Sequence, residues 1–161
     1  MKKLMLGITL LSTLLVAGQI SFAQSSAAAS VSVNANVIAS LSITPSTATL
    51  NFGDVAQGTS PVVAPASGIA FTVAGEPNHT ATLVYNSTLQ LNGPNGATLT
   101  FTANVIGNTT NSTSGATSFP SGITLNGSGN YYLWLGGGLG SIPANQATGA
   151  YSGNYTIAVH Y

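Results

Sequence analysis

Apolar and polar residues alternate along most of this chain. The longest alternation covers residues 30–44, where valine, alanine, leucine and isoleucine occupy every second position. Successive side chains of a strand point to opposite faces, so this pattern predicts one long first strand or two strands joined at a bend. Pro45 follows and ends the predicted strand, because proline cannot donate to a ladder.

The same alternation returns in short segments separated by turn residues. The segments are 48–52, 62–63, 69–73, 81–85, 89–91, 97–105, 123–125, 131–135 and 155–161. Gly136-Gly137-Gly138 is predicted to break the strand before it, and residues 107–122, rich in Asn, Thr and Ser, are predicted to form a surface loop. Apolar spacing of three and four residues is absent over any helical length. The pattern predicts an all-β, antiparallel β-sandwich (Ig-like or pilin-like) of about 8–10 short strands, with a closed barrel as the alternative.

The closing strand has two unlike faces. Tyr155, Ile157, Val159 and Tyr161 lie on one face, and small or polar residues lie on the other. A strand with such an aromatic face has to be covered by the rest of the fold or by another molecule.

The first residues have the layout of a secretory signal peptide. Lys2 and Lys3 precede an apolar run, and Ser21-Phe22-Ala23 supplies small residues for a cut after Ala23. We therefore expect a signal peptide over 1–23 and one domain over 24–161, with no membrane span once the signal is removed. A retained membrane anchor is the alternative. The chain contains no cysteine, so no disulfide supports the domain.

Ionisable side chains are very scarce. Both lysines lie in the predicted signal peptide and there is no arginine. Nucleic-acid binding and attachment to anionic lipid both need cationic side chains, so both are excluded as functions of the mature chain. A surface with almost no charge is poorly soluble on its own. It suits a protein packed against neighbours or against the cell surface.

The remaining ionisable residues offer little for catalysis. They are Asp54, Glu76, His79 and His160, and no Gly-x-Ser-x-Gly elbow accompanies them. Glu76 and His79 with Asp54 form a conceivable metal set, but Asp54 and Glu76 are more simply explained as turn residues whose carboxylates accept local N–H bonds. A hydrolase would have to use Glu76, Asp54 or His79. We expect no enzyme activity, no cofactor and no metal.

Several segments resemble a known bacterial secreted family. They are Leu-Asn-Phe-Gly at 50–53, Phe-Thr-Val-Ala-Gly-Glu-Pro at 71–77, Ala-Asn-Gln-Ala at 144–147 and the closing Gly-x-Tyr-x-Gly-x-Tyr-x-Ile-x-Val-x-Tyr at 149–161. Together they resemble the family catalogued as domain of unknown function 4402. The alternating aromatic ending is also similar to that of spore-coat-U-type and chaperone–usher pilin subunits, which commonly carry a disulfide. The resemblance implies an exported β-sandwich with no assigned activity.

Two functions remain open. The first is an exported structural or cell-surface protein, such as a fimbrial or surface-layer subunit, secreted or held at the cell surface after passing through the periplasm. Its partners would be copies of itself or other surface proteins, and its candidate strand-exchange segment contains Val31, Val33, Val37 and Leu41. An ordinary first strand paired within its own domain is the competing interpretation of that segment.

The second function is a carbohydrate- or ligand-binding module. Its candidate platform is formed by Trp134 with Tyr131 and Tyr132, although aromatic residues on a strand apolar on both faces also suit a buried core.

Overall fold

The computed structural model describes residues 27–161, so the predicted signal peptide lies outside the described residues. The chain divides into two units, Met1–Ala35 and Asn36–Tyr161. The described part of the first unit, 27–35, is exposed and contains no strand. All of the sheet structure lies in the second unit. No helix within 27–161 has the length and apolar character needed to span a bilayer.

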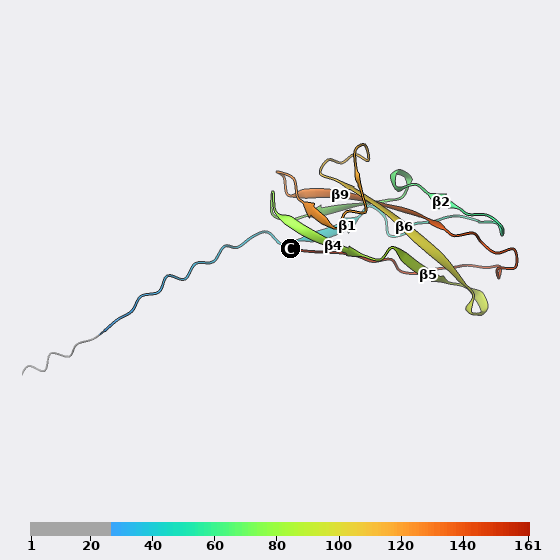
Figure 1. The fold of residues 1–161 in the computed structure, drawn as a ribbon, viewed down its shortest axis with the longest axis horizontal. Coiled ribbons are helices and arrows are strands. Elements are labelled where there is room, and N and C mark those ends of the chain that lie inside the picture. The colour runs from blue at the N-terminus through green and yellow to red at the C-terminus, as the bar shows by residue number, and fades with distance from the viewer. Residues whose placement is uncertain (1–26) are drawn as a thin grey trace, which may run out of the picture. The chain divides into compact units, whose positions relative to one another are not determined.

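Sheet A is the larger of two antiparallel sheets (Figure 1). Its strands lie in the order β1 (Ser42–Pro45), β3 (Ile69–Ala74), β9 (Asn130–Leu139), β6 (Thr98–Asn108) and β5 (Thr88–Asn92). Two short strands extend it, since β2 (Val62–Val63) pairs with β9 and β7 (Thr117–Ser118) pairs with β6. The central pair, β6 and β9, has eight residues in register from Phe101↔Leu139 to Asn108↔Tyr132.

Sheet B has only three strands. Its order is β10 (Ile157–His160), β4 (Thr80–Tyr85) and β8 (Gly122–Thr124), all antiparallel. The two sheets pack face to face, which confirms the predicted all-β sandwich. Two 3-10 turns, η1 (Pro65–Ser67) and η2 (Pro94–Gly96), complete the described secondary structure.

The core lies between the inner face of sheet A and sheet B. Strand β6 shows the expected alternation, with Leu99, Phe101, Ala103 and Val105 buried and their neighbours on the other face. The core is completed from sheet B by residues such as Leu83 of β4. Burying apolar area of this kind is the main favourable term in folding, so the long alternations did identify the core strands.

The prediction that Gly136-Gly137-Gly138 breaks a strand is wrong, because β9 continues through all three residues to Leu139. A Cβ on Gly136 would lie 2.4 Å from the carbonyl oxygen of Val63, and one on Gly137 would lie 2.3 Å from that of Thr102. These glycines therefore permit neighbouring backbones to approach the strand closely. Glycine within a strand can serve such a close approach as well as end the strand.

Three other predicted strands differ from the structure. The long first strand over 30–44 is reduced to β1, and residues 27–41 form no strand. Residues 48–52 alternate but pair with no strand in the part of the chain that the structure describes, and the closing strand begins only at Ile157. Alternation reports which side chains are apolar, whereas a strand also needs a neighbouring backbone, and that neighbour is not visible in the local sequence.

Replacing Gly136 with alanine tests the close approach at β9. We expect Gly136→Ala to lower the free energy of unfolding by about 1–3 kcal/mol, because the added methyl meets backbone atoms that cannot rotate away. The matched control is Gly140→Ala, where no atom lies within 4 Å of the new Cβ. Urea denaturation of both variants provides the comparison, and equal stability of the two would contradict this account.

Candidate functional site

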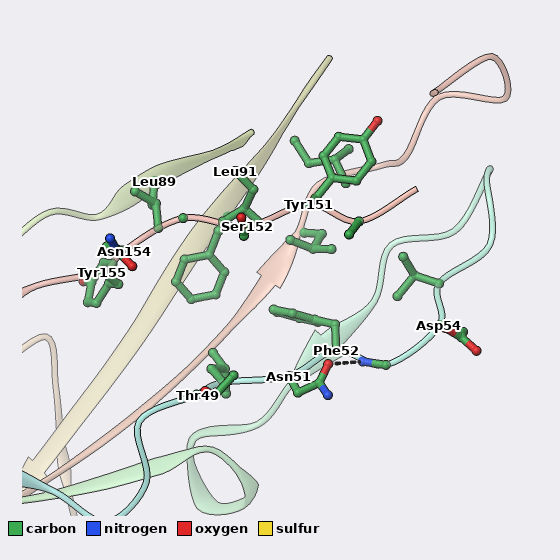
Figure 2. Close-up of a pocket in the computed structure, with 18 of the residues that line it drawn as sticks. Thr49, Asn51, Phe52, Asp54, Leu89, Leu91, Tyr151, Ser152, Asn154 and Tyr155 are labelled. Atoms are coloured by element: carbon green, nitrogen blue, oxygen red, sulfur yellow. Dashed lines mark hydrogen bonds between the residues drawn. The ribbon is translucent and has the colours of Figure 1, made fainter. Parts of the chain in front are cut away.

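A large groove with an apolar floor opens on the inner face of sheet A, over strands β3, β5, β6 and β9. Its volume is about 980 Å³, and it lies between residues 47–55, which follow β1, and residues 146–155, which precede β10. We call these two segments the first lip and the second lip, and the space between them the open groove. Figure 2 shows Thr49, Asn51 and Phe52 of the first lip on one side and Tyr151 to Tyr155 of the second lip on the other.

The floor of the open groove is the inner face of sheet A. It is lined by apolar side chains of β3, β5, β6 and β9, namely Ile69, Phe71, Leu89, Leu91, Leu99, Phe101 and Leu135. Phe101 lies centrally, because its ring makes edge-on contacts with Phe52 of the first lip at 6.0 Å and with Tyr155 of the second lip at 5.8 Å. Aromatic pairs at these distances and angles are favourable. One ring therefore connects both lips to the floor.

The first lip is held almost entirely by apolar packing. Leu50 and Phe52 are half-buried against the core, and Thr49 and Asn51 between them are exposed. Its one hydrogen bond within the described residues is local, from the Gly53 N–H to Asn51 Oδ1 at 2.8 Å. An extended segment with free backbone donors and acceptors is equivalent to the edge of a sheet.

The second lip is fixed more firmly at its start. Gln146 Nε2 donates to the Thr98 carbonyl oxygen at 3.1 Å and to the Tyr151 hydroxyl at 2.7 Å. Ser152 exchanges two backbone hydrogen bonds with Asn92 of β5. The backbone of residues 153–155 makes no hydrogen bond outside the strand ladders to any part of the chain that the structure describes. The second lip thus changes from paired to unpaired along its length.

The open groove combines an apolar floor with lips that carry many polar side chains. Asp54 is the one carboxylate among its lining residues. Burial raises the pKa of Tyr155 from 10.0 to about 12, with a smaller contribution from Tyr85, so the Tyr155 hydroxyl stays neutral near neutral pH. That hydroxyl donates to the Asn86 carbonyl oxygen. The apolar floor and the polar backbone of the lips are the features by which the groove can recognise apolar side chains and backbone amides.

A second feature is a clamp around Ala39, formed by Glu76 and Tyr161. The Ala39 N–H donates to Glu76 Oε2 at 2.8 Å, and the Tyr161 hydroxyl donates to the Ala39 carbonyl oxygen at 2.9 Å. The same hydroxyl accepts the Glu76 N–H at 2.6 Å, and the Tyr161 ring contacts His79 edge-on. The carboxylate and the last residue of the chain thus hold both polar backbone groups of Ala39.

The predicted strand-exchange residues separate into two groups at this clamp. Before it, Val31, Val33 and Val37 are 83%, 89% and 93% exposed. After it, Leu41 is half-buried against the core of its own domain. The segment available to a partner therefore ends before Ala39, and we call residues 30–37 the arm.

The three residues of the predicted platform do not share one open face. Tyr131 and Trp134 are both buried, and only Tyr131 belongs to the core cluster between the sheets, so the two rings lie on opposite faces of β9. Tyr132 is half-buried. On the Trp134 side, the 3-10 turn η1 packs against β9. The rings expose little surface on which a sugar could stack.

The ionisable residues are dispersed. Asp54 lies at the open groove, Glu76 and His79 lie beside Tyr161, and His160 is exposed on β10. No group of three His, Cys, Asp or Glu residues able to hold a metal occurs within 27–161.

The open groove itself was not foreseen from the sequence. Its only sequence signal is the alternation over residues 48–52, which predicted an ordinary strand. The clamp was missed as well, since Glu76 was explained as a turn residue. Its carboxylate instead bonds a residue 37 positions away in the chain, which no local pattern reveals.

Comparison with known proteins places the chain in context. Residues 12–161 match a domain of unknown function, DUF4402. No curated protein matches the chain.

The clamp can be tested by removing one hydroxyl. We expect Tyr161→Phe to lower the free energy of unfolding by about 0.5–1.5 kcal/mol, because the Glu76 N–H and the Ala39 carbonyl lose their shared partner. Tyr132→Phe is the matched control, since the Tyr132 hydroxyl bonds to nothing within 27–161 and its loss should change stability by only a few tenths of a kcal/mol. Urea denaturation measures both, and equal losses would refute the clamp.

Stability should also fall at high pH because of Tyr155. Its pKa is raised in the folded protein, so the unfolded chain releases this proton first and the free energy of unfolding decreases between about pH 10 and pH 12. Tyr155→Phe removes this contribution, although it also loses the bond to Asn86. The stability gap between the native protein and the variant should therefore narrow over that range in denaturation at stepped pH, and a constant gap would contradict the assignment.

Proposed function

Since the chain belongs to the DUF4402 family, whose description assigns no activity, we propose its function from its structure: an exported, non-enzymatic structural subunit of a surface assembly, similar in its mode of association to a pilin. The observation that carries the proposal is the arm. Its valines alternate as in a strand, yet they are more than four-fifths exposed. Exposed apolar residues in a regular pattern are typical of protein–protein contact surfaces.

The scarcity of charge supports the same function. Outside the predicted signal peptide the chain has two carboxylates and two histidines. Glu76 is used in the clamp, and Asp54 belongs to no cluster of three His, Cys, Asp or Glu residues within 27–161. What remains is apolar surface and unpaired backbone, the two resources by which strands associate. A carbohydrate-binding role has less support, because Trp134 and Tyr131 are buried.

The proposal predicts assembly that depends on concentration and on the arm. Mature chain starting at Gln24 should form filaments in negative-stain images, and its mass in light scattering should rise with concentration. Replacing Val31, Val33 and Val37 together with serine should abolish assembly and leave the fold intact, because these exposed side chains contribute nothing to the core. The matched control replaces Ser30, Ser32 and Asn34 with alanine.

Two results would refute this function. One is a monomer at every concentration tested, with no filaments on cells that export the chain. The other is filament formation that the triple serine variant does not affect. Circular dichroism of each variant confirms that a loss of assembly is not a loss of folding.

A further inference from the structure

We propose that the open groove is the receiving site for the arm of a second copy of this chain, which enters as an added strand with alternate side chains on the groove floor. This inference rests on the proposed function and assigns the site and the segment that would carry it out. Each chain carries both a groove and an arm. In the proposed assembly, the groove of one copy is filled by the arm of the next.

The side chains of the two surfaces are complementary. In the arm, Val31, Val33, Ala35 and Val37 share one parity, and serine and asparagine occupy the other. The part of the groove floor that a strand can reach is apolar: Phe71 of β3 and Leu89 and Leu91 of β5 are partly exposed there, whereas Phe101 is buried beneath Phe52 and Tyr155. An arm in strand conformation would place its valines on this floor and its Ser and Asn residues toward solvent. No residue of the arm carries a charged side chain, so none has to be desolvated.

The backbones are complementary as well. Over residues 47–55 the first lip makes no backbone–backbone hydrogen bond within the described chain, and residues 153–155 of the second lip are equally unpaired. A strand lying in the groove would find free N–H and C=O groups on its borders. This is the arrangement in which an extended peptide adds to a sheet edge, with main-chain bonds giving affinity and alternate side chains giving specificity. The eight residues of the arm span about 26 Å when extended.

A neighbouring copy suits the groove better than the chain's own arm. To pair with its own first lip, the arm would have to reverse direction between Val37 and Leu41. That stretch is Val-Ile-Ala-Ser-Leu, in which Ser40 is the one residue that favours turns, and it favours them more weakly than Gly, Pro, Asn or Asp. The clamp also engages both backbone groups of Ala39, so that residue has none left to close a turn.

A small apolar ligand is the other conceivable occupant. The volume of about 980 Å³ lies at the upper end of the range for small-molecule sites. Such a ligand would fill the floor but leave the unpaired backbone of both lips without partners. A strand would make apolar contacts with the floor and backbone hydrogen bonds with the lips at the same time. This chain carries a strand-like segment that has no partner within its own described residues.

The test uses the absence of native cysteine. Single cysteines are placed along the arm of the full mature chain, at Val31, Val33 and Val37 on one parity and at Ser32, Asn34 and Asn36 on the other. Each variant is labelled with a maleimide before and after assembly. We expect assembly to slow labelling by at least about tenfold at the three valine positions and by less than about threefold at the other three, because alternate residues of a strand face opposite sides.

A second measurement does not depend on assembly. A synthetic peptide of residues 30–41 is added to the full mature chain carrying Val31→Ser, Val33→Ser and Val37→Ser, whose own arm should not compete. Hydrogen exchange of the amides of residues 48–52 and 153–155 should slow when the peptide binds. The control peptide carries Val33→Asp and Val37→Asp, which should prevent binding because buried carboxylates would lack partners.

The outcomes separate this inference from the proposed function. Filaments with equal labelling at all six positions would overturn the groove assignment and leave the structural role standing. Peptide protection of the lips in a protein that never assembles would support the groove assignment and refute the structural role. Protected valines in a monomer at high dilution would show an arm in its own groove and overturn exchange between copies. Neither protection nor assembly would overturn both.

Discussion

The unequal size of the two sheets is the constraint on which the rest of this structure depends. Sheet A has seven strands and sheet B has three, so sheet B covers only part of the inner face of sheet A. Apolar surface left in water is unfavourable, and the chain covers the remainder with two segments outside any sheet, residues 47–55 and 146–155. These segments pack against the core through Leu50, Phe52 and Tyr155. The open groove is the space left between them.

The sequence predicted side-chain faces well and pairing poorly. Alternation identified β6 and β9 because their apolar residues lie on the core, and this information is local. The same alternation in residues 30–37 and 48–52 predicted strands that the domain does not pair. Pairing depends on backbone brought from a distant part of the chain, which a local pattern cannot report. For the same reason Gly136 was explained as a break, although it serves a close contact with β2.

The candidate site was less predictable than the fold, because it is formed where two segments of backbone have no neighbouring strand to pair with. A groove of this kind has no motif: Phe52, Phe101 and Tyr155 come from three separated segments and have ordinary core chemistry. The clamp was hidden for a related reason, since Glu76 and Tyr161 lie 37 and 122 positions from Ala39 in the chain. That the chain has no enzyme activity stays a prediction, drawn from its few ionisable groups.

A subunit with an open groove and an exposed apolar arm is exposed to unwanted association, and its lack of net charge provides no repulsion against it. The polar residues that alternate with the apolar ones in these segments can limit this unwanted association. Ser32, Asn34 and Asn36 alternate with the valines of the arm, and Thr49 and Asn51 alternate with the apolar residues of the first lip. An arm inserted in the groove would turn both polar sets to solvent, whereas an arm lying on a flat surface elsewhere would gain apolar contact but leave its backbone unpaired. In the proposed assembly, backbone pairing and side-chain parity would together select the groove, and they would provide in a nearly uncharged protein the specificity that charged side chains provide in others.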